Sequence, residues 1–138
     1  MELSTETATS YCRHALTQLL TVAERVGETR INERPVGPDT NSVAALILHC
    51  CGVSEFWLGH VGLGRPSQRD RDSEFAKTAT LDELHAAVAA TVRQIGTDLE
   101  ALEAIAPGGE SEFAAGRQFL LQADESDGSL IVHVIEEL

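Results

Sequence analysis

A histidine stands in the middle of the most apolar segment of the chain, where a dry helix core is expected. His49 lies within residues 41–57, which read Asn-Ser-Val-Ala-Ala-Leu-Ile-Leu-His-Cys-Cys-Gly-Val-Ser-Glu-Phe-Trp. A titratable ring in a dry core needs a hydrogen-bond partner, a carboxylate or a metal ion. A hydrogen-bonded core histidine is the commoner outcome. The neighbours of His49 on its own line of the helix are mostly small and apolar and offer no obvious partner, which favours a ligand or catalytic role.

A second group of candidate ligands stands near the end of the sequence. His133 and Glu137 are four residues apart, so they share one face of a predicted helix. A surface pair is the ordinary interpretation of this spacing, but helical bundles build metal sites from such residues on facing helices. The open question is whether folding brings His49 to Glu137 or to His133. Catalytic metal sites usually have three protein ligands, so a third must come from elsewhere, and one turn after Glu137 falls past Leu138.

Three arginines follow the apolar segment in a polar stretch rich in glycine and proline. Arg65, Arg69 and Arg71 are predicted to orient an anionic substrate at the mouth of a bundle, because guanidinium groups bind anions through paired hydrogen bonds. A solvated run of charges is the alternative interpretation. The adjacent Cys50 and Cys51 point about 100° apart on a helix, so they cannot bind one metal together and are predicted to be small buried hydrophobes.

Four helices are expected to position these residues, over residues 4–27, 42–57, 80–106 and 130–138. Ser4 and Gly27 are the predicted caps of the first helix, and Asn41 or Ser42 caps the second. Thr80 and Glu83 form a capping box at the start of the third. Long polar connections between helical segments predict an all-α four-helix bundle, with the second helix the most buried.

Apolar residues at helical spacing predict which face of each helix packs inward. For the first helix the predicted stripe is Tyr11, Ala15, Leu19, Val22 and Val26. For the second it is Val43, Leu46, Ile47, Cys50, Val53 and Trp57. For the third it is Leu84, Val88, Thr91, Ile95, Leu99 and Leu102. For the last it is Leu130, Ile131, Val134, Ile135 and Leu138, on a helix that we expect to be truncated.

Composition restricts the class of protein. The chain has 138 residues, of which 43% are hydrophobic, and this predicts a single soluble domain over residues 1–138. A net charge of −12 argues against binding to nucleic acid or to an anionic membrane surface. The N-terminal residues do not resemble a signal peptide. Three cysteines, an odd number, favour a reducing cytoplasm over a disulfide framework.

Several segments resemble the DinB-like superfamily, and in particular the branch related to mycothiol-dependent maleylpyruvate isomerase. They are residues 40–57, the Gly64-Arg-Pro stretch, the Arg69-Asp-Arg-Asp-Ser-Glu-Phe stretch, and residues 127–138, which read Asp-Gly-Ser-Leu-Ile-Val-His-Val-Ile-Glu-Glu-Leu. The resemblance implies a four-helix bundle that holds a divalent metal, zinc or nickel-like. It implies that His49 is the first ligand and Glu137 the second, that His133 is not a ligand, and that a final histidine lies past Leu138.

The resulting functional hypothesis is a metal-dependent transferase or isomerase that uses a low-molecular-weight thiol as nucleophile against an electrophilic small molecule. A metal ion stabilises the thiolate of a thiol that is mostly protonated at neutral pH. Mycothiol as that thiol is implied by the resemblance alone. The alternative hypothesis is a bundle without catalysis, acting as a binding module or scaffold, because members of a fold often lose their sites.

We expect a homodimer, with the last helix at or near the interface. That helix is too short to be stable alone, and exposed apolar surface tends to find partners. The net charge of −12 opposes association, so the dimer should strengthen as salt screens the repulsion. Sedimentation at low and high salt measures this, and a monomer at micromolar concentration under both conditions would contradict it.

Overall fold

All of the secondary structure described is helical. The computed structural model describes residues 4–104 together with Val134 and Leu138. Its elements are α1 (Thr5–Val26), α2 (Val43–Ser54), the π-helix η1 (Glu55–Gly62), α3 (Arg71–Glu74) and α4 (Leu81–Ala104). No strand occurs among these residues. The predicted all-α class is therefore confirmed.

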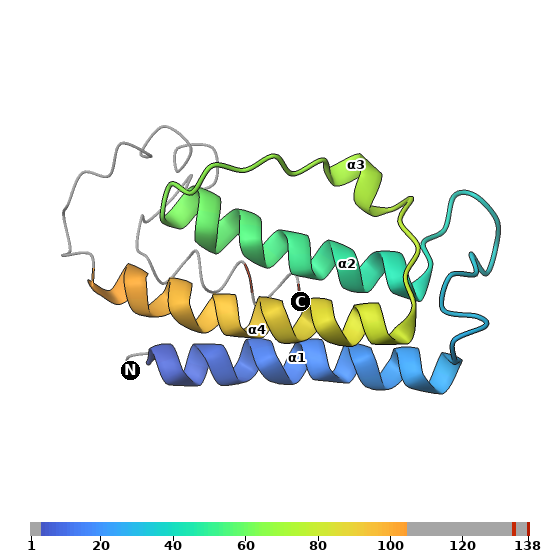
Figure 1. The fold of residues 1–138 in the computed structure, drawn as a ribbon, viewed down its shortest axis with the longest axis horizontal. Helices are drawn as coiled ribbons and strands as arrows, with labels where there is room; N and C mark the ends of the chain where they lie inside the picture. The colour runs from blue at the N-terminus through green and yellow to red at the C-terminus, as the bar shows by residue number, and fades with distance from the viewer. Residues whose placement is uncertain (1–3, 105–133, 135–137) are drawn as a thin grey trace.

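Three long helical stretches pack side by side (Figure 1). α1 lies beside α4 and runs antiparallel to it, and α2 lies along the other side of α4 and runs parallel to it. Two parallel neighbours need a long connection, and residues 63–80 supply it by running back over α2 from the end of η1 to the start of α4. This crossover carries the short helix α3 and packs against α2.

The predicted helix starts are confirmed by their hydrogen bonds. The Ser4 and Ser42 side chains accept from the backbone amides of Thr7 and Ala45, so each caps its helix. Thr80 and Glu83 exchange the reciprocal bonds of a capping box, at 2.8 and 3.2 Å. The stretch after Ala104, including the predicted end of the third helix, lies outside the described residues.

The predicted inward stripe of the first helix is wrong by one position. Tyr11 and Val22 are 60% and 48% exposed. The buried face of α1 is instead Ala8, Cys12, Leu16, Leu20 and Ala23. Apolar residues occupy both stripes, one position or about 100° apart, so periodicity could not choose between them. The face with smaller side chains is the one that packs, because it lets neighbouring helices approach closely.

The second helix departs from its predicted face where it becomes a π-helix. Leu46 is 42% exposed, whereas Ile47 and Cys50 are buried as expected. Beyond Ser54 the chain turns with i→i+5 hydrogen bonds, which place more residues in each turn and shift the buried face. Leu58 therefore enters the core where Trp57 was predicted, and Trp57 packs only at its edge.

α2 and η1 together form a helical stretch of 20 residues whose length and mean hydropathy would allow it to cross a membrane. The central helix of a soluble bundle meets the same test. Here the stretch packs against both α1 and α4. Among the described helices α4, not the second helix as predicted, lies in the middle (Figure 1).

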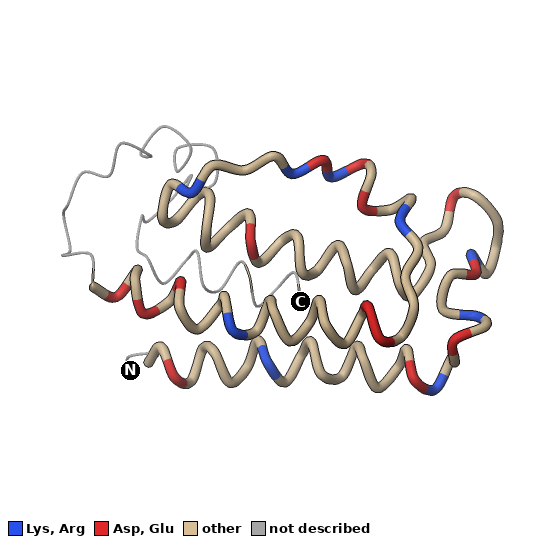
Figure 2. The backbone as a smooth tube through the Cα atoms, viewed as in Figure 1, with Lys and Arg blue, Asp and Glu red and all other residues tan. Residues whose placement is uncertain are grey.

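Charged residues of both signs alternate along the crossover above α2 (Figure 2). Asn32 anchors the far end of the crossover. Its side chain donates to the Ala79 carbonyl at 2.9 Å and accepts from the Ala79 amide at 3.0 Å. Arg34 also donates to the Phe75 carbonyl at 2.7 Å. The connection between α1 and α2 thus fixes the crossover just before α4 begins.

The last predicted helix is described only at two residues. Val134 is helical and buried in the common core, and the Leu138 amide donates to its carbonyl at 3.2 Å. Leu138 packs at the edge of the core. Part of the predicted apolar face of this helix therefore packs on its own bundle.

Replacing Thr80 by alanine should lower the free energy of unfolding by about 1 kcal/mol, because the capping box loses the hydroxyl that accepts from the Glu83 amide. Chemical denaturation measures the change. Thr97→Ala, an exposed position inside α4, is the matched control and should be neutral or slightly stabilising. Equal losses in the two variants would show that the capping box does not stabilise α4.

Candidate functional site

His49 is hydrogen-bonded to a carboxylate that the crossover brings over α2. Its Nδ1 lies 2.9 Å from Oε2 of Glu74, and only 13% of the histidine side chain is exposed. The ring also packs against Phe75, with ring centroids 4.5 Å apart. The partner that a buried histidine requires therefore comes from 25 residues further along the chain.

Arg69 binds the same carboxylate with two hydrogen bonds. Its Nε donates to Glu74 Oε1 at 2.7 Å and its Nη2 to Oε2 at 2.8 Å, in the side-on geometry that suits a guanidinium and a carboxylate. The guanidinium also lies over the Phe56 ring, 5.5 Å from its centre. His49, Arg69 and Glu74 form one nearly buried group, which we call the histidine cluster.

The carboxyl group of Glu74 is ionised in this cluster. Burial opposes its ionisation, but hydrogen bonds and charge from Arg69 and His49 outweigh burial and hold its pKa below the ordinary value. A carboxylate only accepts hydrogen bonds, so Nδ1 of His49 must carry the proton in the bond that joins them. In the neutral ring, the lone pair is therefore on Nε2.

A glycine makes room for the cluster on the surface of α2. A Cβ at Gly52 would collide with Oε1 of Glu74, and it would lie 3.0 Å from Cδ of Glu74 and 3.2 Å from Nε of Arg69. Any side chain at this position would push the carboxylate away from the helix. The absence of a side chain at Gly52 thus sets how closely the crossover approaches His49.

A second ion-pair cluster lies at the end of η1. Arg65 donates from Nη1 to Glu55 Oε2 at 2.8 Å and binds both carboxylate oxygens of Asp98 on α4. Asp98 is 2% exposed and also accepts from Gln94 at 2.8 Å. The bond to Asp98 raises the pKa of the Arg65 guanidinium. We call this group the arginine clamp, because Arg65 joins η1 to α4.

The clamp is held by the backbone as well as by its charges. A Cβ at Gly59 would collide with the Arg65 guanidinium, so Gly59 leaves room for Arg65 as Gly52 does for Glu74. The Arg65 amide donates to the Gly59 carbonyl at 2.9 Å, and His60 Nδ1 donates to the Arg65 carbonyl at 2.6 Å.

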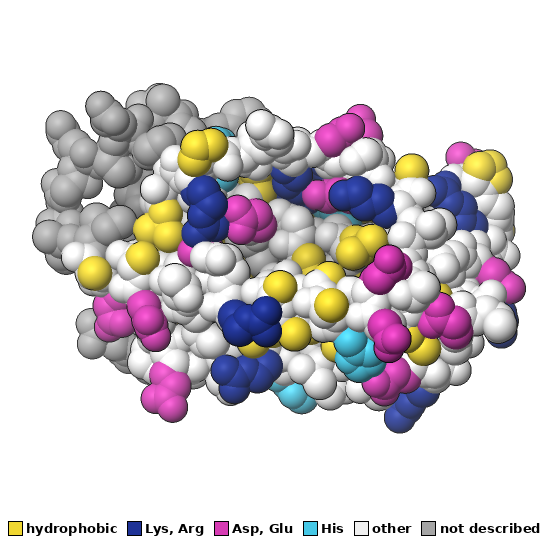
Figure 3. All heavy atoms as spheres, viewed as in Figure 1, with side chains coloured by type: hydrophobic (Ala, Val, Ile, Leu, Met, Phe, Trp, Pro, Cys, Tyr) yellow, Lys and Arg dark blue, Asp and Glu magenta, His cyan; other side chains and the backbone are white. Residues whose placement is uncertain are grey.

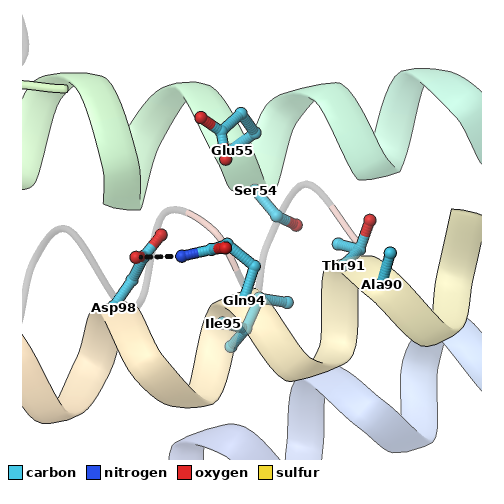
Figure 4. Close-up of a pocket in the computed structure, with 7 residues that line it drawn as sticks. All are labelled: Ser54, Glu55, Ala90, Thr91, Gln94, Ile95 and Asp98. Carbon is cyan, nitrogen blue, oxygen red and sulfur yellow. Dashed lines mark hydrogen bonds between the residues drawn. The ribbon is translucent and has the colours of Figure 1, made fainter. Parts of the chain in front are cut away.

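A cavity of about 300 Å³ lies between α2, η1 and α4. Figure 3 shows the surface hollowed between these helices, with charged side chains along its edge. Figure 4 shows the residues that line it: Ser54, Glu55, Ala90, Thr91, Gln94, Ile95 and Asp98. The arginine clamp borders the cavity. Cys51 connects the cavity to the histidine cluster. Its thiol hydrogen-bonds to Thr91 in the cavity lining and interacts electrostatically with Glu74.

The arginines predicted to bind substrate have different surroundings. Arg65 and Arg69 are paired with carboxylates of the chain itself, whereas Arg71 is exposed and lies over the Phe75 ring, 5.5 Å from its centre. Glu137 and His133 lie outside the described residues, so their distance from His49 is not described. Among the residues that are described, no three His, Cys, Asp or Glu side chains are grouped to hold a metal.

The cysteines have the environments of small apolar residues. Cys12 and Cys50 are buried and Cys51 is partly buried, and none of the three forms a disulfide. Burial raises the pKa of Cys12 to about 11 and also raises that of Cys51, so neither thiol is activated as a nucleophile.

Three carboxylates of these clusters were not predicted from the sequence: Glu74, Glu55 and Asp98. A signal for Asp98 existed, because alternating spacings of four and three run from Leu84 through Ile95 and place Asp98 on the apolar face. A carboxylate in that position requires a cation. Nothing comparable in the sequence indicates that Glu74 is buried, since it follows a run of charged residues of the kind that is typical of a solvated surface.

A sequence profile described as the DinB superfamily matches residues 11–127 of the chain. No curated protein and no solved structure gave a significant match. The matched segment includes both clusters and the whole crossover.

Replacing Glu74 by glutamine should lower the free energy of unfolding at neutral pH by about 3 kcal/mol, because Arg69 loses its buried counter-charge. The folded-state pKa of Glu74 is depressed, so its contribution is present above the ordinary carboxyl range and is lost as pH falls through the folded value. Denaturation at neutral and acid pH should therefore show the two proteins converging in acid. Glu100→Gln, on the exposed side of α4, is the control. A loss as small as the control's, or one that does not shrink in acid, would contradict this account.

Proposed function

Because the chain belongs to the DinB superfamily, we propose that it is a metal-dependent enzyme that uses a small-molecule thiol as nucleophile, with His49 as a metal ligand. The observation that carries the proposal is the bond between Nδ1 of His49 and the Glu74 carboxylate. Metal-binding histidines usually donate their second ring N–H to a carboxylate or carbonyl, which fixes the tautomer and strengthens the ligand. The donor set at His49 fits this pattern.

The roles of the chain's own residues follow from the geometry. Glu74 holds the ring with Nε2 as the donor atom, Arg69 keeps Glu74 ionised, and Phe75 fixes the plane of the ring. Glu137 is the proposed second ligand, as the resemblance implies. A divalent cation, zinc or nickel-like, would stabilise the thiolate of the co-substrate when bound.

The identity of the thiol and of its acceptor is a finer part of the proposal. Mycothiol as co-substrate follows from the resemblance to the isomerase branch, and the acceptor would be an electrophilic small molecule. Arg71 is the arginine best placed to meet an anionic group, because Arg65 and Arg69 already bind internal carboxylates. We also propose a cytoplasmic homodimer, without nucleic-acid or membrane partners.

A scaffold without catalysis is the rival proposal, and one observation favours it. His49 already has the partner that a core histidine needs, since Glu74 accepts from its Nδ1 and Phe75 packs against its ring. Under this proposal the histidine cluster serves only to fasten the crossover to α2.

Metal analysis of His49→Ala separates the two proposals. If His49 is a ligand, the purified variant should retain much less divalent metal than the natural protein and should lose thiol-dependent activity. If it is structural, the variant should mainly lose stability, by about 1–3 kcal/mol for the orphaned partner. His85→Ala, at an exposed histidine on α4, is the matched control and should keep its metal. Unchanged metal content in His49→Ala, or a natural protein without metal when expressed from the complete gene, would overturn the enzyme proposal.

A further inference from the structure

The carboxylates that line the cavity between α2, η1 and α4 outnumber the cation that binds them. Glu55 and Asp98 contribute two carboxylates to its lining, and the described lining contains no lysine or arginine. Arg65 binds both carboxylates from outside the lining, so the three groups together carry a net charge of −1. The cavity therefore attracts a cation and repels an anion.

Two of the polar side chains that line the cavity offer an acceptor oxygen. Glu55 binds Arg65 through Oε2, and no described residue donates to its Oε1. Gln94 directs its amide nitrogen to Asp98, because a carboxylate can only accept, and this leaves the Gln94 carbonyl oxygen as an acceptor beside the cavity. These two oxygens suit a ligand that carries several N–H donors.

The rest of the cavity suits a short hydrocarbon body. Ala90 and the methyl group of Thr91 supply apolar surface on the α4 side, and the lining also includes Ile95, which is 1% exposed. A volume of about 300 Å³ lies at the small end of the range for ligand pockets. The negative charge of the cavity, its acceptor oxygens and its small volume together indicate a compact ligand with one cationic group that donates hydrogen bonds.

We propose that this cavity binds a small organic cation, a primary ammonium with a short aliphatic chain. The ammonium group lies between Glu55 Oε1 and the Gln94 carbonyl, and the chain lies on Ala90 and the methyl group of Thr91. The inference does not depend on a metal at His49, so the two proposals can fail separately.

The test is an NMR titration of the isotope-labelled full chain with three probes of equal size: butylammonium, 1-butanol and butyrate. Butylammonium should shift the amides of Thr91, Gln94 and Ile95 saturably, and the alcohol and the acid should bind at least tenfold more weakly. Equal binding of either of these two probes, or shifts that miss these three amides, would overturn the proposal.

Two variants and a control make the result specific. Glu55→Gln should weaken butylammonium binding about tenfold, because one charged acceptor is lost. Glu100→Gln removes the same charge from the exposed side of α4 and should leave binding unchanged. Ala90→Leu fills the cavity from a helical position that tolerates leucine, and it should abolish binding while the remaining spectrum stays folded. Binding that survives Ala90→Leu, or that falls equally in both glutamine variants, would refute the site.

Discussion

The need to neutralise one buried carboxylate governs how the crossover lies on α2. Glu74 is 4% exposed, and an unpaired charge at that depth would cost several kcal/mol. Arg69 comes from the same crossover and His49 from α2, so the carboxylate is satisfied only when the two segments are in contact. The interaction therefore sets the position of residues 63–80 and fixes the orientation of the His49 ring.

The arginine clamp repeats this arrangement at the other end of the crossover. Arg65 brings the chain that leaves η1 back to α4, where Asp98 is nearly inaccessible to solvent. In both clusters a glycine of α2 or η1 removes the Cβ that would block the charged partner, Gly52 under Glu74 and Gly59 under Arg65. Close approach to the helix and exclusion of water strengthen both ion pairs.

These two clusters determine what the molecule offers to ligands. Arg65 and Arg69, two of the four cationic side chains of the crossover, are bound to internal carboxylates and are not available to a ligand. The cavity beside them is left with an excess of negative charge and of acceptors. The bond to Glu74 places a proton on Nδ1 of His49, so Nε2 is the ring nitrogen left to act as a donor atom to a metal. The same ion pairs thus shape both proposed sites.

The sequence by itself determined the helical class, the caps at Ser4 and Thr80, a cap at Asn41 or Ser42, and the need of His49 for a partner. The caps depend on contacts within one or two helical turns, and the helical class and the need of His49 for a partner follow from the pattern of apolar residues. Both can be recognised in the local sequence. Only the tertiary structure decided which of two adjacent stripes on α1 is buried, where the π-helix shifts the core face of the second helix, and that Glu74 is the partner of His49. Each of these depends on residues distant in sequence meeting in space. Two equally apolar faces have similar local free energies, and a carboxylate in a charged run becomes a core residue only when a crossover folds back over it.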